Sequence, residues 1–522
     1  MLGSHVLADL EADQLSEHID IATPWGKQEV QTRIQSPSSS IRALKQAQLP
    51  LLALKHRDAV AALPLVRSEI KNCIAPHSEI IDECCKDVDS RIQESVGQIL
   101  WSPKSLVAPL NKVPVVVSGL VTWKTIVLPA IAVIMPLLAI IAPFFVLRFV
   151  QGEKVGATEY MSHVRKILLS QVSIPPSLRA KHGGDVVGYV IETGFLLITC
   201  FTFVSGIWNQ IVTALHQRRI AADLEARSAA IHESVASVRR VLDILNGLPS
   251  RLKVALCKLM NEGDAVLKLF EGMPAGLAGF GFVWNDSQPL HKLREWIGRV
   301  DMYTSIASLK SICFPQFSRG TSLQLRGVYH PRINPANRVF NNANFGEKHH
   351  VVLTGPNRGG KSTFCKAVGL AVLCAQTLGF AWAAEMRLEP FIAMETALSP
   401  TDELGKLSLF EAEIEFAKTV LERSASPGPV LVMMDEIFHS TNASDGLAAS
   451  RVFLEKLYIH GNVTSIVSTH YRELVKSFSK EANAWAMEAH EKEDGLLNYS
   501  YRVVSGVSDK SSVMEILRER GL

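Results

Sequence analysis

The chain has 522 residues, which is enough for several domains and at least one large core. Its 54 basic and 51 acidic residues nearly balance to a net charge of +3, which argues against a broad basic surface for nucleic acid and leaves only local patches for such a role. Hydrophobic residues make up 47% of the chain and the mean hydropathy is +0.15; both values are high for a soluble protein and fit a chain that lies partly in lipid.

Residues 1–111 predict a polar, helical N-terminal region with a linker at 36–40. The first residues are acidic and lack an apolar h-region, so we do not expect a secretory signal. The eight cysteines of the chain form neither a CxxC pair nor a Cys/His metal spacing, which predicts reduced thiols in a reducing compartment. We interpret this region as a helical scaffold without chemistry of its own.

A transmembrane helical hairpin is predicted within residues 112–216. Its first span, 125–149, carries the single charge Arg148, and about 20 apolar residues in a helix cross a hydrocarbon core of about 30 Å. Prolines at every seventh position of this span predict a kink or a packed side (Pro129, Pro136 and Pro143). The second span, 193–215, is weaker because it holds Asn209 and Gln210. The alternative is a buried hairpin in a large soluble core.

Residues 217–317 predict a helical lever or clamp. Apolar residues recur there at steps of three, four or seven, which predicts a coiled-coil seam, with an ordinary bundle helix as the alternative. These residues are Leu224, Ile231, Val235, Val238, Leu242 and Leu245. Glycine and proline cluster at 271–282 and predict a reversal loop, after which a helical pattern resumes at Leu290. Two long helices joined by such a turn would form a stiff arm.

Residues 318–522 have a different pattern. Short, apolar, β-rich runs at 349–355, 428–436 and 463–470 alternate with helical segments. This alternation predicts a buried, mostly parallel sheet covered by helices, that is, an α/β domain.

A glycine-rich loop follows the first of these strands. Residues 355–362 match GxxxxGK[ST], the phosphate-binding loop (P-loop) of nucleoside triphosphatases, between a strand and a helix. Lys361 is predicted to reach the β and γ phosphates, the Ser362 hydroxyl to bind Mg²⁺, and the helix N-terminus to face the anion. The predicted nucleotide-binding residues of this loop are Gly355, Pro356, Asn357, Gly359, Gly360, Lys361, Ser362 and Thr363.

Three further residues are predicted to complete the chemistry. Asp435 follows the apolar run 430–434 and is the expected second metal ligand, and Glu436 comes next as the base that polarises the attacking water. His470 ends another strand and is predicted to sense the γ-phosphate; the alternative is a histidine with a purely structural hydrogen bond.

A serine, Ser408, precedes a helical segment. A serine at this position is usually an N-cap. In ABC-type ATPases, however, a serine at a helix start reaches across a dimer to the nucleotide of the partner.

Together these motifs resemble the MutS family of ABC-type ATPases. The resemblance rests on "TGPNRGGKST", "SLFEAEI", "DEIFHSTNASDG" and "STHYREL", and it extends over residues 215–520. Upstream, "GVYHPRI" and "RVFNNANF" resemble the segment that contacts adenine, near Asn341 and Asn342. The resemblance implies an obligate dimer that hydrolyses Mg·ATP at two composite sites, each with the P-loop of one subunit and Ser408 of the other. Lys361, Glu436 and His470 would be the catalytic residues.

Three departures from the family pattern stand out. No aromatic-x-Glu wedge for entering DNA is found before residue 215, where the apolar hairpin lies instead. Arg358 replaces a usual methionine, and "HSTNASDG" replaces the usual "GRGTSTYDG" after Asp435 and Glu436. The phosphate chemistry is thus kept while mismatch recognition is unsupported, so the chain resembles a membrane-associated branch of the family.

Three functions remain open from the sequence. The first is a membrane-associated, dimeric ATPase that opens and closes helical arms, with the ATPase domain in the cytosol. Arg218 and Arg219 after the second span agree with this topology, whereas the basic residues between the spans do not, which leaves a re-entrant or surface-lying hairpin open. The second is a DNA mismatch repair or recombination ATPase that binds duplex DNA. The third is a nucleotide-gated scaffold with negligible turnover.

Overall fold

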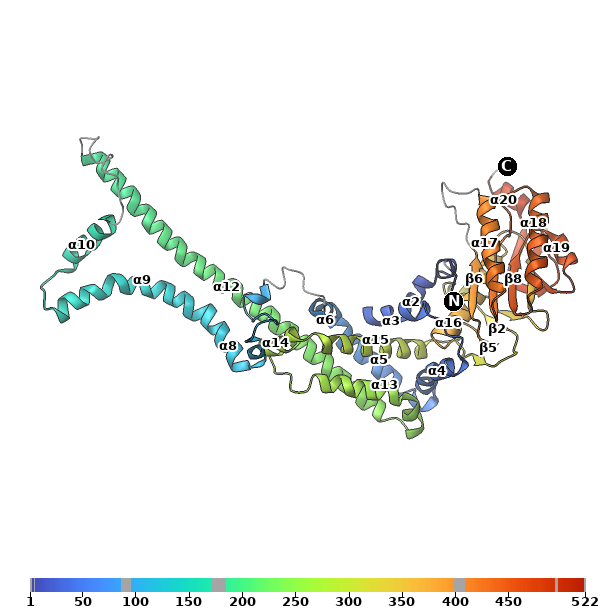
Figure 1. Cartoon of the computed structure of the whole chain (residues 1–522), viewed down its shortest axis with the longest axis horizontal. Helices are drawn as coiled ribbons and strands as arrows, with labels where there is room; N and C mark the ends of the chain where they lie inside the picture. Colours follow the sequence, from blue (N-terminus) through green and yellow to red (C-terminus); the bar gives the residue numbers. More distant parts are fainter. Residues whose placement is uncertain are drawn as a thin grey trace. The chain divides into compact units, whose positions relative to one another are not determined.

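The computed structural model describes residues 2–3, 5–85, 95–170, 185–398, 409–492 and 496–520 (Figure 1). The chain divides into two compact units. The first comprises Met1–Pro76, Ser237–Leu267 and Leu293–Leu522, and the second comprises His77–Ala236 and Lys268–Lys292. Predicted Ser408 lies outside the described residues.

The first unit contains a six-stranded sheet in the order β10-β9-β4-β8-β7-β6. Strands β4, β6, β7, β8 and β9 run parallel, and β10 pairs antiparallel with β9 at the edge. The strands are β4 (His350–Thr354), β6 (Ala393–Ala397), β7 (Val430–Met434), β8 (Val463–Ser468), β9 (Ala482–Glu491) and β10 (Leu497–Ser505). The predicted mostly parallel α/β sheet is confirmed, and its three predicted strands are β4, β7 and β8.

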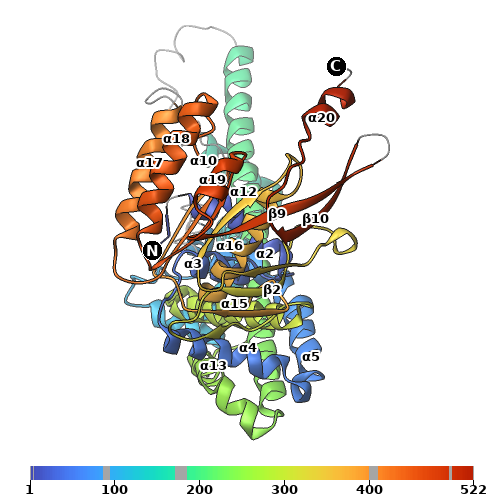
Figure 2. The same cartoon turned by 90° about the vertical axis from the view of Figure 1, so that its right-hand side faces the viewer.

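Helices cover both faces of this sheet because successive side chains of a buried strand point to opposite sides. Val430, Val432 and Met434 of β7 pack in the core formed with α17 (Leu409–Ser424), α18 (Ala443–Tyr458) and α19 (Arg472–Ser477), which lie together on one side (Figure 2). On the other side, Met433 faces Gly369 of α16 (Lys361–Thr377), where a Cβ would lie 2.6 Å from the methionine Cε. Glycine therefore permits the close approach of α16 to the sheet.

A second sheet has four strands in the order β1-β5-β2-β3; three of them precede β4 in the sequence, and β5 lies between β4 and β6. Its strands are β1 (Gln316–Phe317), β2 (Gln324–Val328), β3 (Asn341–Asn344) and β5 (Glu385–Leu388), with the short helix η8 (Pro335–Asn337) between β2 and β3. The side chain of Asn341 links the two sheets, because its Nδ2 donates to the Tyr501 carbonyl at 3.0 Å and its Oδ1 accepts from Val503 N at 2.8 Å. The last helix is α20 (Val513–Glu519).

The N-terminal helices pack in the same unit as the six-stranded sheet. They are α1 (Val6–Asp9), η1 (Ala12–Gln14), α2 (Leu15–His18), α3 (Pro24–Ile34), α4 (Ile41–Lys55), η2 (Arg57–Ala59), α5 (Ala62–Glu69), η3 (Ile70–Ile74) and η4 (Ala75–His77). Thr23 caps α3 through Gly26 N, and the buried carboxylate of Asp301 accepts 2.7 Å bonds from both Thr23 N and Thr23 Oγ1. This carboxylate joins α3 to α15 (Gln288–Ser308).

The first residues of the chain bind the six-stranded sheet directly. Gly3 N donates to Met394 O at the edge strand β6, and the buried Asp9 accepts a 3.0 Å bond from Leu398 N. Glu11 pairs with Lys366 of α16 at 2.9 Å and with Arg332. Residues of the region predicted as an inert scaffold therefore contact the six-stranded sheet and the helix packed on it.

The second unit holds the apolar helices. One continuous helical stretch consists of α8 (Pro114–Thr122), η6 (Trp123–Val127), α9 (Leu128–Phe145) and η7 (Val146–Val150), and another is α12 (Asp185–Asn246). The remaining elements are α6 (Ser78–Cys85), η5 (Ala108–Lys112), α10 (Ala157–Ser170) and α14 (Leu277–Asn285), while α13 (Ser250–Leu269) leads from the first unit back to the second. Val96, Val117, Leu224 and Phe280 contribute to its buried core.

Within the described residues, two stretches are long and apolar enough to cross a bilayer, by length and composition. They are Pro114–Val150 and Leu197–Asn246, with mean hydropathies of 2.7 and 1.4 in their most apolar windows. The buried share of these windows is 0% and 6%, which argues against the alternative of a hairpin hidden in a soluble core. The prolines Pro136 and Pro143 lie inside α9.

The predicted reversal loop at 271–282 is wrong over its second half, because α14 begins at Leu277. Its glycines serve close packing: a Cβ on Gly279 would lie 2.4 Å from Ser228 Oγ, and one on Gly281 would lie 2.3 Å from the Asn111 carbonyl oxygen. The predicted stripe lies on α12 and is buried, apart from the half-buried Val235. The predicted boundary at 216/217 falls inside this helix.

Candidate active site

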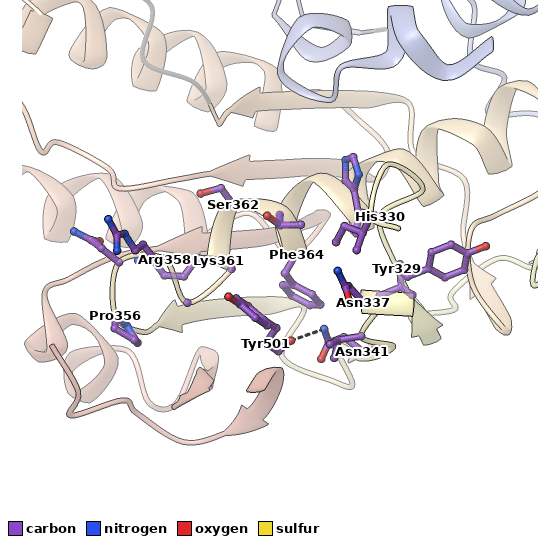
Figure 3. Close-up of a pocket in the computed structure, with 18 of the residues that line it drawn as sticks. Tyr329, His330, Asn337, Asn341, Pro356, Arg358, Lys361, Ser362, Phe364 and Tyr501 are labelled. Atoms are coloured by element: carbon purple, nitrogen blue, oxygen red, sulfur yellow. Dashed lines mark hydrogen bonds between the residues drawn. The ribbon is translucent and has the colours of Figure 1, made fainter. Parts of the chain in front are cut away.

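The loop between β4 and α16 is shaped by glycine and by a buried lysine. Gly360 has φ 95°, a left-handed conformation that glycine adopts without strain, and a Cβ there would lie 3.2 Å from the Tyr501 ring. Lys361 begins α16, and its Nζ donates to the Gly355 carbonyl at 3.2 Å. Its side chain is only 5% exposed, so its charge is held within the loop (Figure 3).

A carboxylate and two hydroxyls meet beside this loop. Asp435, directly after β7, accepts hydrogen bonds from Ser362 Oγ and Ser468 Oγ. The Asp435 backbone is fixed as well, because its N–H donates to the Ala397 carbonyl at 2.8 Å. Hydroxyl and carboxylate oxygens are the ligands that Mg²⁺ prefers, so the donor set of Ser362 and Asp435 fits this ion.

Glu436 lies between a lysine and a histidine. Its Oε1 is 2.8 Å from His470 Nε2 and 3.8 Å from Lys361 Nζ. The hydrogen bond with His470 lowers the pKa of Glu436 against the opposing effect of burial, and the nearby Lys361 lowers it further. Glu436 is therefore an ionised carboxylate at neutral pH, as a general base requires.

A cavity of about 690 Å³ adjoins these residues. On one side it is lined by the loop residues Pro356 to Thr363, including Arg358, which has a left-handed φ of 66°. On the other side lie Tyr329, His330, Ile333, Asn337 and Asn341, with the rings of Phe364 and Tyr501 between the two (Figure 3). The cavity is thus polar at the loop, and beyond it aromatic and aliphatic side chains are mixed with His330, Asn337 and Asn341.

Most predicted residues come together here. Lys361, Ser362, Asp435, Glu436 and His470 gather at the carboxyl ends of β4, β7 and β8. Asn341 lines the cavity, whereas Asn342 does not, because its Oδ1 accepts from Gly327 N at 2.9 Å. Gly355 is not among the lining residues, but its carbonyl holds Lys361.

Three residues of this region were missed from the sequence. Ser468 ends β8 and donates to Asp435. Its place could be inferred from the sequence, because β7 and β8 are parallel strands and the residues at their carboxyl ends meet at the same edge of the sheet. Tyr501 lies on β10, where a bulge and a left-handed φ of 55° are not visible in the sequence. His330 is buried, which lowers its pKa to about 4 and keeps it neutral beside the cavity.

Comparison with known proteins agrees with this arrangement. Residues 351–522 match the family model of MutS domain V. This part of the chain is therefore similar to MutS domain V.

The curated proteins that resemble this chain include DNA mismatch repair proteins MutS. The protein from Thermotoga petrophila is 30% identical over 243 residues, which is 45% of this chain and 30% of that protein. The Thermus thermophilus protein is 29% identical over 241 residues, which is 45% of this chain and 29% of the length of that protein. The chain thus aligns with less than a third of the length of these MutS relatives. Asn341 and Asn342 precede the range that matches MutS domain V.

Proposed function

We propose that this chain is a membrane-associated, homodimeric MutS-type ATPase that binds and hydrolyses Mg·ATP to open and close helical arms. The observation that carries the proposal is the convergence of Lys361, Ser362, Asp435, Glu436 and His470 at one edge of a parallel sheet. In open α/β sheets, ligands bind at the carboxyl ends of the strands.

The triphosphate would lie along the loop from Pro356 to Thr363. Backbone N–H groups there and at the start of α16 favour an anion, and the buried Lys361 ammonium adds a full positive charge. Lys361 Nζ, which donates to the Gly355 carbonyl in this structure, would donate to phosphate oxygens when the nucleotide binds. The aromatic part of the cavity, with Tyr501 and Phe364, offers faces on which a purine base stacks.

Ser362 and Asp435 would hold Mg²⁺, which supplies charge neutralisation of the phosphate oxygens. Ser468 Oγ keeps the Asp435 carboxylate in place. Glu436, held ionised by His470 and Lys361, orients the attacking water and takes its proton. His470, as the partner of Glu436, adjoins the place where the γ-phosphate would leave. Together these residues would give hydrolysis a base, the Lys361 ammonium and two ligands for the metal ion.

Two apolar stretches support the membrane part of the proposal. Pro114–Val150 has a mean hydropathy of 2.7 in a window with no buried residue, and large side chains such as Ile131 and Leu138 are exposed along it. Phe201 and Trp208 are exposed along the second stretch. Lipid is the environment in which such surfaces are stable. The ATPase domain would face the cytosol, where ATP is found.

Direct tests separate the two parts of the proposal. Purified full-length protein should hydrolyse ATP with Mg²⁺, and Lys361→Ala should weaken ATP binding about 10- to 100-fold because a charge-assisted contact is lost. Lys418→Ala is the control, since Lys418 is exposed on α17. Unchanged ATP affinity of Lys361→Ala would contradict the loop's role.

For the membrane part, carbonate extraction should leave the intact chain in the membrane pellet and release a variant lacking residues 113–216.

DNA mismatch repair or recombination is the second candidate, because the relatives are named DNA mismatch repair proteins. The arms would then enclose duplex DNA. Binding of this kind weakens steeply with salt, because phosphate contacts release counterions. Release of the intact chain by carbonate, together with DNA affinity that falls steeply between low and physiological salt, would favour this function over the membrane one.

A further inference from the structure

One carboxylate ties the loop after β7 to helix α17. Glu413 of α17 lies with its Oε1 3.0 Å from His439 Nδ1, and its Oε2 accepts a hydrogen bond from Ser440 Oγ. The Glu413 side chain is 18% exposed, so it is largely enclosed by these contacts. Helix α17 begins at Leu409, one residue after Ser408. Glu413 therefore connects the helix that follows the predicted trans-acting serine with the segment "HSTNASDG".

His439 also contacts the residue that we propose as the base. Its Nδ1 lies 2.8 Å from the Glu436 carbonyl oxygen. Since both neighbours of Nδ1 are acceptors, Nδ1 carries the proton and donates to both. His439 thus closes a tight turn over residues 436–439 and is itself held by Glu413.

This turn contains unfavourable backbone conformations, so hydrogen bonds from outside the turn must stabilise it. Glu436 has φ 52° and Phe438 has φ 50°, left-handed conformations that a Cβ disfavours. The Glu436 N–H is fixed from the sheet side by the Ser468 carbonyl at 3.1 Å, whereas its carbonyl is fixed by His439. The direction of the Glu436 carboxylate, which contacts His470, depends on this backbone conformation. A displacement of the His439 ring would therefore change the orientation of the Glu436 carboxylate.

We propose that Glu413 and His439 form a positioning pair that couples the position of α17 to the orientation of the Glu436 carboxylate. The inference rests on the proposed ATPase function, in which Ser408 of one subunit meets the nucleotide of the other. When that contact fixes the position of α17, Glu413 fixes the position of the His439 ring. His439 in turn stabilises the turn over residues 436–439, which directs the Glu436 carboxylate toward the attacking water. Neither residue lines the cavity, so we expect the pair to act on the rate of hydrolysis and not on ATP binding.

Two replacements of His439 separate positioning from packing. In His439→Asn the side-chain amide nitrogen takes the place of Nδ1, whereas in His439→Gln it extends beyond that place. With Mg·ATP and the full-length dimer, we expect kcat to fall about 10- to 100-fold in His439→Gln with KM and nucleotide affinity unchanged, and His439→Asn to recover most of kcat. Equal kcat in wild type and His439→Gln would overturn the proposal.

Replacement of the carboxylate gives the matched test. Glu413→Ala should lower kcat as much as His439→Gln, and the double variant should be no worse than either single variant, because both remove the same link. Glu415→Ala, whose side chain is 61% exposed two residues further along α17, should leave kcat unchanged. Additive losses would show that the residues act separately and would overturn the pair.

The outcomes also distinguish this inference from the proposed function. If wild-type protein neither binds nor hydrolyses ATP, the ATPase proposal itself fails. If wild-type protein hydrolyses ATP and the pair variants match it, only the coupling fails. A parallel loss of ATP affinity and kcat in His439→Gln, His439→Asn and Glu413→Ala would show a purely structural role and would also overturn the coupling.

Discussion

His470 Nε2 lies 2.8 Å from Glu436 Oε1, and the two residues come from the ends of neighbouring parallel strands. This contact lowers the pKa of Glu436 more than any other interaction does, and it leaves the carboxylate ionised while Lys361 stays 3.8 Å away. An ionised carboxylate beside a lysine and a histidine is a base with a fixed orientation. Without the contact between His470 and Glu436, the position of these three side chains at the sheet edge would not by itself indicate a base.

Replacement of Glu436 tests the base directly. Glu436→Gln keeps the size of the side chain and a contact for His470 but cannot accept a proton, so ATP should still bind while hydrolysis falls about 10²- to 10⁴-fold. Binding is measured with a fluorescent ATP analogue and turnover by phosphate release. Glu415→Gln, on an exposed part of α17, is the control. Normal turnover in Glu436→Gln would remove Glu436 as the base.

Tyr501 provides a test of the far side of the cavity. Its ring lies beside Gly360 and lines the cavity with Phe364, so Tyr501→Ser should weaken ATP binding about 5- to 50-fold through lost base stacking, whereas Tyr501→Phe should be nearly neutral. Inorganic triphosphate, which has no base, should bind wild type and Tyr501→Ser equally. An equal loss for ATP and triphosphate would place the effect of Tyr501 at the loop instead of at the base.

The sequence predicts the parts of this site that depend on local pattern. The strand–loop–helix order around Lys361 and the apolar run before Asp435 are read within a few residues, and both lie as predicted along β4, α16 and β7. Tyr501 could not be found in this way, because its place beside Gly360 depends on the antiparallel addition of β10 and on a bulge.

The contact of Asp9 with Leu398 joins residues 389 positions apart, and no local periodicity reports such a pair. At 271–282, the glycine and proline pattern predicts a turn, whereas Gly279 and Gly281 serve helix packing. Local chemistry was thus accessible from the sequence, while long-range packing was not.

A buried histidine predicts acid sensitivity of the fold. Burial lowers the pKa of His350 from 6.5 to about 4, and its Nδ1 lies 3.0 Å from Ser465 Oγ. Between these values the unfolded chain binds a proton that the folded chain does not, so the stabilisation is complete above about pH 6.5 and is lost as the pH falls toward 4. At pH 5 the loss is roughly 2 kcal/mol.

The measurement is the midpoint of thermal unfolding of purified protein from pH 7 to pH 5. His350→Phe keeps the ring against Tyr458, with which His350 stacks at 4.1 Å, and removes the titrating group. Its midpoint should therefore fall less steeply with decreasing pH than that of wild type. His490→Asn is the control, because the His490 side chain is 67% exposed. Parallel slopes for wild type and His350→Phe would exclude His350 as a source of the acid sensitivity.

The composite site is tested by mixing subunits. Ser408→Ala should impair hydrolysis at the partner's site while leaving its own P-loop intact, and Lys361→Ala should do the reverse. In a heterodimer of the two variants, one site carries both defects and the other carries neither, so about half of wild-type activity per dimer should return relative to either variant alone. Activity is measured on tagged heterodimers isolated by tandem purification. If the heterodimer is as inactive as the Lys361→Ala homodimer, Ser408 does not act across the interface, and each subunit must complete its own site.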